Sequence, residues 1–327
     1  MCSKTAKAQL LARVQSVSPV TSVFVGAGHF VCGDEDGSVR CYILSPDNTG
    51  ELRWEREHTG SVTGIKMIKG LVMTCSLDCT ISCWMVSDGA HCWQVKHDDI
   101  VNGICADDRR LVSCSDDHSL KCWSTDTGEQ QWQAHHEEGV LDCDMYKESV
   151  VTVSTDCTVR CWNASDGQSR WQGEMHKTWV VKVRICAEVV VTASIDKTVR
   201  CWMMNSGDHV WAADHLAPVI QLGIGEGVIV SSDREKIYCW DVRTGQLLWD
   251  ISPSSRVCAL GIGEASLTVG TDDSNVTVYA LSAKGGKRLC SISSTGIAHS
   301  IHQGAGNVAL GCATGGRAAC WSLGGVA

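Results

Sequence analysis

The chain has 327 residues, 44% of them hydrophobic and 20% charged, so it can bury a core and is neither disordered nor collagen-like. Its 37 acidic and 28 basic residues give a net charge of -9, which argues against nucleic acid as a partner, because phosphate binding depends on clustered Lys and Arg. No apolar run approaches the roughly 18 residues of a membrane span. In so long a chain the 20 cysteines are expected to be reduced thiols, and we expect a cytoplasmic protein without membrane contact.

An aromatic residue recurs along the chain with a period near 40. It is preceded by a small apolar residue, which is Cys in seven repeats and Val278 in the other. A period of this length is typical of a repeat array or a propeller. The aromatics of the eight repeats are Tyr42, Trp84, Trp123, Trp162, Trp202, Trp240, Tyr279 and Trp321.

Within one repeat, period-two alternation and turn residues predict four short strands. In the second repeat these are 62–68, 71–76 and 80–86, followed by a fourth strand after the turn at 87–89. Glycine suits that turn, because a positive φ is often needed there. Four short strands joined by tight hairpins form one blade of a β-propeller. Six fourth strands carry a second tryptophan, four residues after a glycine: Trp54, Trp93, Trp132, Trp171, Trp211 and Trp249.

The two chain ends predict how the ring closes. Only residues 322–327 follow the last aromatic, too few for a fourth strand, whereas residues 9–15 have no partner in their own repeat. We therefore predict an all-β fold, a single β-propeller of eight four-stranded blades, with seven blades as the alternative. The N-terminal strand would pair into the last blade and remove two exposed sheet edges. Residues 1–8 are expected to be a flexible tail, and residues 9–327 one propeller domain.

Four repeats carry the same polar residues at the same spacing, in which His leads Asp by 20 residues and Asp leads Trp by 6. This pattern resembles the WD-repeat family, and the resemblance covers nearly the whole chain. It implies a hydrogen-bonded tetrad in each blade, joining the loop before the innermost strand to the hairpin between the second and third strands. One network would satisfy side chains that are costly to bury alone. The four tetrads are His58, Ser76, Asp78 and Trp84; His97, Ser115, Asp117 and Trp123; His136, Ser154, Asp156 and Trp162; and His176, Ser194, Asp196 and Trp202.

The sixth repeat departs from this pattern. Its corresponding residues have altered spacing, and the Asp that gives the WD family its name follows the aromatic only here, at Asp241. The stretch from Asp241 to Trp249 resembles the outer-strand motif of eight-bladed quinoprotein-like propellers instead. That resemblance implies a quinone cofactor, but the adjacent cysteine pair of those enzymes does not occur in this sequence, and we expect no cofactor. The residues of the sixth repeat are His215, Ser231, Asp233 and Trp240.

Two other kinds of chemistry are weighed against a structural role. Ser, His and Asp are the residue types of a hydrolase triad, but their recurrence in four repeats and the lack of a G-x-S-x-G motif favour structure, so we expect no catalytic residue. Cys75, Cys79 and Cys83 recur at every fourth position. Zinc ribbons pair their cysteines in C-x-x-C knuckles, so we expect no metal site.

The tetrad face is the face of the ring that carries the loops before the first strands and the hairpins between the second and third strands. Loops on a rigid frame often carry binding, so we expect partners there. An exposed apolar patch marks an interaction surface, and Trp is enriched at interface hot spots. The apolar residues at aligned loop positions form one arc: Leu141 in the fourth blade, Trp179, Val181 and Ile195 in the fifth, and Pro218 and Ile220 in the sixth. The alternative is that part of this arc packs inward as core.

The sequence thus predicts a non-enzymatic, cytoplasmic scaffold or adaptor that docks an apolar or amphipathic segment of a protein partner near Trp179. One alternative is a purely structural subunit of a large assembly, such as a ubiquitin-ligase, ciliary or ribonucleoprotein complex. Another is an enzyme or cofactor carrier that uses the central channel, which would require titratable groups facing inward. The inner-strand residues predict an apolar channel instead: Ile65, Ile104, Val183 and Leu222.

Overall fold

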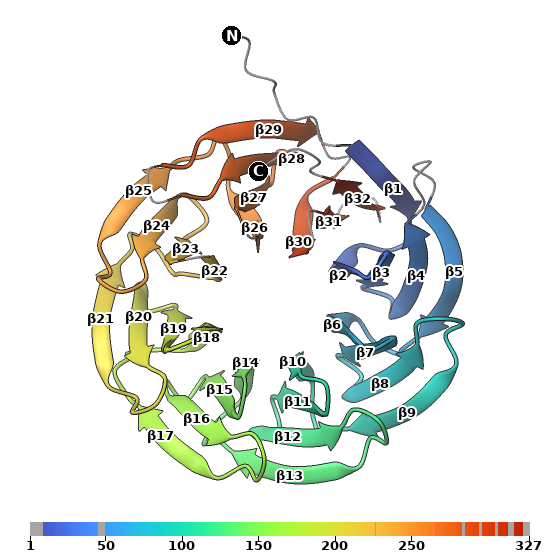
Figure 1. Ribbon diagram of the computed structural model, residues 1–327, viewed down its shortest axis with the longest axis horizontal. Coiled ribbons are helices and arrows are strands. Elements are labelled where there is room, and N and C mark those ends of the chain that lie inside the picture. The colour runs from blue at the N-terminus through green and yellow to red at the C-terminus, as the bar shows by residue number, and fades with distance from the viewer. Residues whose placement is uncertain are drawn as a thin grey trace.

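The strands of the computed structural model form a closed ring of blades around a common axis (Figure 1). The structure describes residues 9–44, 50–225, 227–263, 265–282, 285–293, 296–304, 307–312 and 317–322. Within these residues the strands group into eight four-stranded antiparallel sheets, and the predicted all-β propeller is confirmed. The expected flexible tail, residues 1–8, lies outside the described residues. The described residues include no helix long and apolar enough to cross a membrane.

Each of the first four blades runs from the ring centre outward in chain order. Blade 1 comprises β2 (Val20–Gly26), β3 (His29–Asp34), β4 (Ser38–Leu44) and β5 (Gly50–Glu57). Blade 2 comprises β6 (Val62–Ile68), β7 (Leu71–Ser76), β8 (Thr80–Met85) and β9 (His91–Lys96). Blade 3 comprises β10 (Val101–Ala106), β11 (Arg110–Ser115), β12 (Ser119–Ser124) and β13 (Gln130–His135). Blade 4 comprises β14 (Val140–Tyr146), β15 (Ser149–Ser154), β16 (Val159–Asn163) and β17 (Ser169–Gly173).

Blades 5 to 7 repeat this order, and blade 8 combines strands from both chain ends. Blade 5 comprises β18 (Val180–Cys186), β19 (Val189–Ser194), β20 (Thr198–Met203) and β21 (His209–Asp214). Blade 6 comprises β22 (Gln221–Gly225), β23 (Val228–Ser232), β24 (Ile237–Asp241) and β25 (Leu247–Ile251). Blade 7 comprises β26 (Val257–Ile262), β27 (Ser266–Thr271), β28 (Asn275–Ala280) and β29 (Arg288–Ser293). Blade 8 comprises β30 (Ala298–Gly304), β31 (Asn307–Cys312), β32 (Arg317–Ser322) and β1 (Gln9–Gln15).

In six blades the cysteine before the aromatic lies opposite the tryptophan of the fourth strand. In blade 3, Cys122 of β12 pairs with Trp132 of β13, and the cysteine is fully buried. Residues directly opposite in an antiparallel pair have close Cβ atoms, so a small apolar side chain leaves room for the indole. This pairing explains the cysteine in the six repeats whose fourth strand carries a tryptophan. The predicted strands of the second repeat agree with the structure except that β8 ends one residue earlier, at Met85.

The fourth-strand tryptophans join neighbouring blades. Trp132 of blade 3 donates its indole N–H to the carbonyl of Ala164 in blade 4, over 2.9 Å. The indole also covers Gly167 of blade 4, where an added Cβ would lie 2.6 Å from the ring. Gly167 has a φ of +71°, so both the backbone conformation and the neighbouring blade require glycine. The same donation, over 2.8–3.1 Å, joins Trp54 to Val86, Trp93 to Thr125, Trp171 to Met204, Trp211 to Val242 and Trp249 to Ser282.

The ring closes by pairing the two chain ends, as the sequence predicts. β1 pairs antiparallel with β32 from Gln9 opposite Ser322 to Gln15 opposite Arg317. Ala12 is fully buried and occupies the place that tryptophan takes in six other blades. The closing contact is therefore a backbone ladder with a small apolar side chain, without an indole donor.

Deleting residues 1–17 removes β1 and leaves the edge of β32 unpaired. We expect the midpoint of thermal unfolding to fall by at least about 5 °C, since both a backbone ladder and buried apolar contacts are lost. Deleting residues 1–8 keeps β1 and is the matched control. Equal midpoints for the two shortened chains, followed by circular dichroism, would contradict this account of closure.

Candidate functional site

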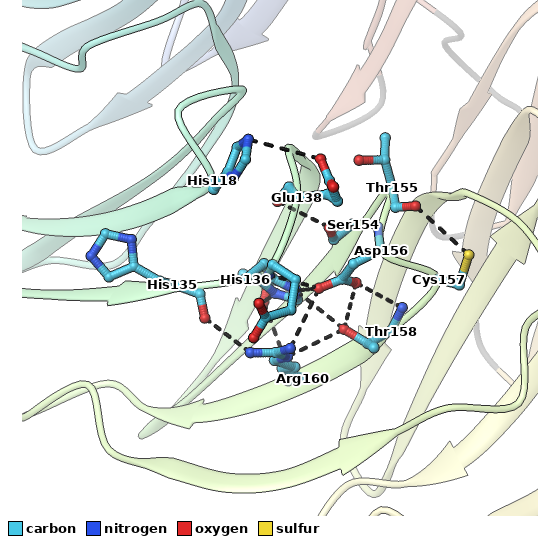
Figure 2. Close-up of polar contacts among 12 residues, drawn as sticks. His118, His135, His136, Glu138, Ser154, Thr155, Asp156, Cys157, Thr158 and Arg160 are labelled. Carbon is cyan, nitrogen blue, oxygen red and sulfur yellow. Dashed lines mark hydrogen bonds and ion pairs between the residues drawn. The ribbon is translucent and has the colours of Figure 1, made fainter.

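The tetrad of blade 4 is a continuous chain of hydrogen bonds from the third strand to the loop before the first strand. Trp162 donates its indole N–H to Thr152 Oγ1 over 2.8 Å, and Thr152 Oγ1 lies 2.8 Å from His136 Nε2. His136 Nδ1 lies 3.0 Å from Asp156 Oδ2. Because an ionised carboxylate only accepts, Nδ1 carries the proton, and Nε2 of the neutral ring accepts from Thr152. Figure 2 shows Asp156 between His136, Thr158 and Arg160.

The serine assigned to each tetrad from sequence is wrong. Ser154 Oγ instead contacts the carbonyl of Gly139, over 2.8 Å, and accepts from the N–H of Asp156. It closes the turn between the loop and the hairpin rather than the link to Trp162. The predicted serines replaced in this way are Ser76, Ser115, Ser154 and Ser194, and the hydroxyls that bond both His and Trp are those of Thr74, Ser113, Thr152 and Thr192.

Blade 6 has a tetrad with a weaker end. Ser231 Oγ contacts His215 Nε2 over 3.0 Å and accepts from the Trp240 indole over 2.8 Å. Asp233 Oδ2 lies 3.7 Å from His215 Nδ1, which has no hydrogen-bond partner in the described part of the chain. His leads the bonded hydroxyl by 16 residues in five blades, a spacing that would have identified the hydroxyl from the sequence.

Burial determines the charge states of the tetrads. It lowers the pKa of His136 and His176 despite the nearby carboxylates, so both rings are neutral near neutral pH. Burial alone would raise the pKa of Asp156, but hydrogen bonds from His136 and Thr158 outweigh it and hold that pKa below its usual range. The tetrad of blade 4 thus combines a neutral imidazole with an ionised carboxylate, and that carboxylate already accepts internal hydrogen bonds.

The predicted apolar arc divides into exposed and half-buried members. Trp179 is 53% exposed, and Pro218 is also exposed. The remaining members are half-buried: Leu141, Val181, Ile195 and Ile220. The position of Leu141, Val181 and Ile220 corresponds to Thr63, whose hydroxyl donates to Val101 of the next blade over 2.6 Å. The Thr63 side chain therefore faces the neighbouring blade at this aligned position, and the docking role of Leu141, Val181 and Ile220 stays a prediction.

The loops of blades 5 and 6 are connected around Trp179. The Trp179 carbonyl accepts hydrogen bonds from Ser194 Oγ, over 2.8 Å, and from the N–H of Ile195, over 3.2 Å. The N–H of Val219 in blade 6 donates to the carbonyl of Ser194 over 3.1 Å. Leu216 in that loop is 81% exposed and was missed from sequence, although an apolar residue directly after the tetrad His was a usable signal.

The centre of the ring carries charged groups beside the expected apolar side chains. A cavity of about 300 Å³ is lined by Arg184 and His302 among other residues of the innermost strands. Alternation along a strand explains this mixture, because successive side chains point to opposite faces. Of the residues expected to line the channel, Ile65, Ile104 and Val183 are buried in the core between blades, whereas Leu222 packs in that core and also lines the cavity.

The central carboxylates accept hydrogen bonds from backbone N–H groups at the edge of an innermost strand. Asp142 Oδ2 accepts from the N–H of Val183 over 3.1 Å and from Arg184 over 2.9 Å. Asp144 Oδ2 accepts from the N–H of Ile185 over 2.9 Å. An edge strand otherwise leaves such N–H groups without acceptors. Within the described residues, no group of three or more His, Cys, Asp or Glu is placed to hold a metal ion.

Replacing Thr152 by Val leaves the Trp162 N–H without an acceptor and His136 Nε2 without a donor. We expect Thr152→Val to lower the free energy of unfolding by about 2 kcal/mol or more, and Ser154→Ala by about 1 kcal/mol. Denaturant titrations of both variants measure the difference. A larger loss for Ser154→Ala would restore the sequence-based assignment.

The burial of His215 predicts a pH dependence of stability. Burial lowers the pKa of His215 to about 4, against an ordinary value of 6.5, so the unfolded chain binds the proton more readily between these values. The resulting stability is complete above about pH 6.5 and is lost as the pH falls toward about 4, by up to about 3 kcal/mol. His215→Gln should therefore have a shallower dependence in this window. The exposed-site control His135→Gln should keep the slope of the parent, and equal slopes for all three proteins would contradict the assignment.

Comparisons with known proteins place these observations in a family. A family model described as "Outer membrane protein assembly factor BamB" matches residues 77–194 and 195–319. No curated protein matches the chain in sequence. Among solved structures, the computationally designed Ika8 protein aligns with 21% identity and a TM-score of 0.87, over 96% of this chain and 99% of its own.

Two natural proteins with solved structures are also similar. Sqt1 of Saccharomyces cerevisiae aligns with 13% identity and a TM-score of 0.83, over 96% of this chain and 99% of that one. BamB from Moraxella catarrhalis aligns with 12% identity and a TM-score of 0.79, over 97% and 100%. At these identities the structures show a shared propeller fold alone. Because the two family matches together span well over half of the sequence, the chain belongs to the family of the outer membrane protein assembly factor BamB.

Proposed function

We propose that this protein is a non-catalytic, cytoplasmic scaffold that docks an apolar or amphipathic segment of a partner protein on its tetrad face. The observation that carries the proposal is the exposed indole of Trp179. Eleven other tryptophans donate their indole N–H within a tetrad or to the next blade. In the described part of the chain the Trp179 indole has no such acceptor, and half of its surface is open to solvent.

Three further observations support this proposal. The His–Asp and Trp–hydroxyl bonds support the resemblance to WD repeats, whose propellers serve as interaction scaffolds. The description of the family as an assembly factor also fits a role in protein contacts. The 18 cysteines whose side chains the structure describes are all free, which favours a reducing compartment.

The alternatives account for less of the structure. A fixed subunit of a large assembly would bind its neighbours through the same exposed surface around Trp179. It would differ from an adaptor only in how long the complex persists. A cofactor carrier would use the ring centre, but Asp142, Asp144 and Arg184 there already hold strand edges or pair with each other. The tetrads likewise offer no free base, because their carboxylates accept several internal hydrogen bonds.

Trp179→Ala removes an exposed aromatic anchor without opening a core cavity. We expect the variant to keep its unfolding temperature and to lose about 2 kcal/mol of affinity, roughly 30-fold in Kd, for a partner recovered by copurification. Isothermal titration calorimetry with the purified partner measures the loss. Leu247→Ala, on outer strand β25 and 42% exposed, is the matched control for losing a surface apolar side chain. Equal affinities for the two variants would remove Trp179 from the site.

A further inference from the structure

The tetrad face carries an uncompensated acidic sector beside the Trp179 patch. The loops and hairpins of blades 3 and 4 on this face, residues 97–100, 115–119, 136–139 and 154–158, contain no Lys or Arg. Outside the tetrads they contribute five carboxylates, defined here as the acidic sector: Asp98, Asp99, Asp116, Glu137 and Glu138. Four of these residues are exposed, and Asp116 is half-buried.

The carboxylates of the acidic sector have few internal partners. Asp116 accepts from the side-chain amide of Asn102 over 2.6 Å, and Glu138 lies 3.9 Å from the exposed imidazole of His118 (Figure 2). Within the described residues none of the five forms an ion pair with Lys or Arg. This contrasts with Asp107, whose carboxylate pairs with Arg110 on the opposite face at 2.7 Å. The sector therefore leaves a local negative field, which attracts positive charge.

An open pocket connects this sector to the blade that carries Trp179. Its volume is about 620 Å³, and its lining includes Glu137 of blade 4 and Glu174 and His176 of blade 5. Arg160 also lines the pocket, but its guanidinium is held by Asp156 and by the carbonyl of His135. Trp179 follows His176 by three residues in the same loop, so the pocket and the exposed indole belong to neighbouring parts of one loop.

The charge changes sign at blade 5. Lys177 and Lys197, on the tetrad-face loop and hairpin of blade 5, are exposed, so the negative field ends where the apolar surface of Trp179, Leu216 and Pro218 begins. A partner that suits both parts has positive charge over blades 3 and 4 and a bulky apolar side chain over blades 5 and 6. Complementary charge fixes the register and direction of such a segment.

Resting on the function proposed above, we infer that the docked segment is a basic-apolar peptide of a partner protein. Its Lys or Arg side chains contact the acidic sector, with one at the pocket beside Glu137, and its bulky apolar side chain packs on Trp179. This differs from a purely apolar ligand, for which the acidic sector would have no role.

Selection of random peptides on the immobilised full-length protein tests this inference. Peptides retained by the parent chain should be enriched in Lys or Arg next to a bulky apolar residue. A selected peptide, made again by synthesis, should bind the double variant Glu137→Gln/Glu138→Gln roughly 10-fold more weakly than it binds the parent protein. This difference in affinity should shrink at high salt. Asp126→Asn/Glu129→Gln removes two exposed carboxylates from the opposite face of blade 3 and should bind as the parent does.

The outcomes separate this inference from the proposed function. Peptides that lose binding in Trp179→Ala but show no preference for Lys or Arg overturn the basic-apolar assignment and leave the docking site intact. Peptides that bind Trp179→Ala as well as the parent overturn both. Retention of no peptide, or selection of acidic peptides, also contradicts the inference, because the acidic sector would then attract no cation in isolation.

Discussion

The structure depends on the contact between a fourth-strand tryptophan and the next blade. Each such indole donates to a backbone carbonyl of the neighbour and covers a glycine that no other residue could replace without a clash, as Trp132 does with Ala164 and Gly167. A single blade cannot bury its own faces, so this repeated contact converts separate sheets into one ring. The cysteine opposite the indole completes the packing. A composition rich in Trp, Gly and Cys is thus a direct consequence of the ring.

The tetrads fix the loops of the tetrad face to the blades. A proton on His136 Nδ1 is held by Asp156 at the hairpin, while the other ring nitrogen is held by Thr152 inside the strand. Because the imidazole is buried and neutral, the network fixes the loop without placing a mobile charge on it. Residues that lie just beyond the network, such as Trp179 and Glu137, are therefore presented on a rigid base. Preorganised loops lower the entropy lost on binding, which suits a docking surface.

Periodicity made the strands, the ring closure and the positions of the fourth-strand tryptophans predictable, because each recurs at a fixed interval or follows from an unpaired end. The tetrad hydroxyl was misassigned because Thr74 and Ser76 lie two residues apart on the same strand face, and in four repeats both positions keep a constant spacing from the histidine. Only the sixth repeat, where His215 keeps the 16-residue spacing to Ser231, distinguishes the two positions. The bonded hydroxyl also belongs to different residue types, Thr74 in blade 2 and Ser113 in blade 3, which makes its recurrence harder to recognise in the sequence. The exposure of Leu216 and the polar ring centre depend on loop paths and unpaired strand edges, which are three-dimensional facts that a local pattern does not contain.

The central claim is that partners bind the tetrad face around Trp179. Hydrogen exchange of the chain with and without its purified partner tests this most directly, since it compares both faces of the ring in one experiment. We predict slower exchange in residues 136–139, 176–179 and 215–218, with no change in the hairpins of the opposite face, such as residues 107–110 and 124–130. Protection confined to those opposite hairpins, or to the outer strands, would contradict the account.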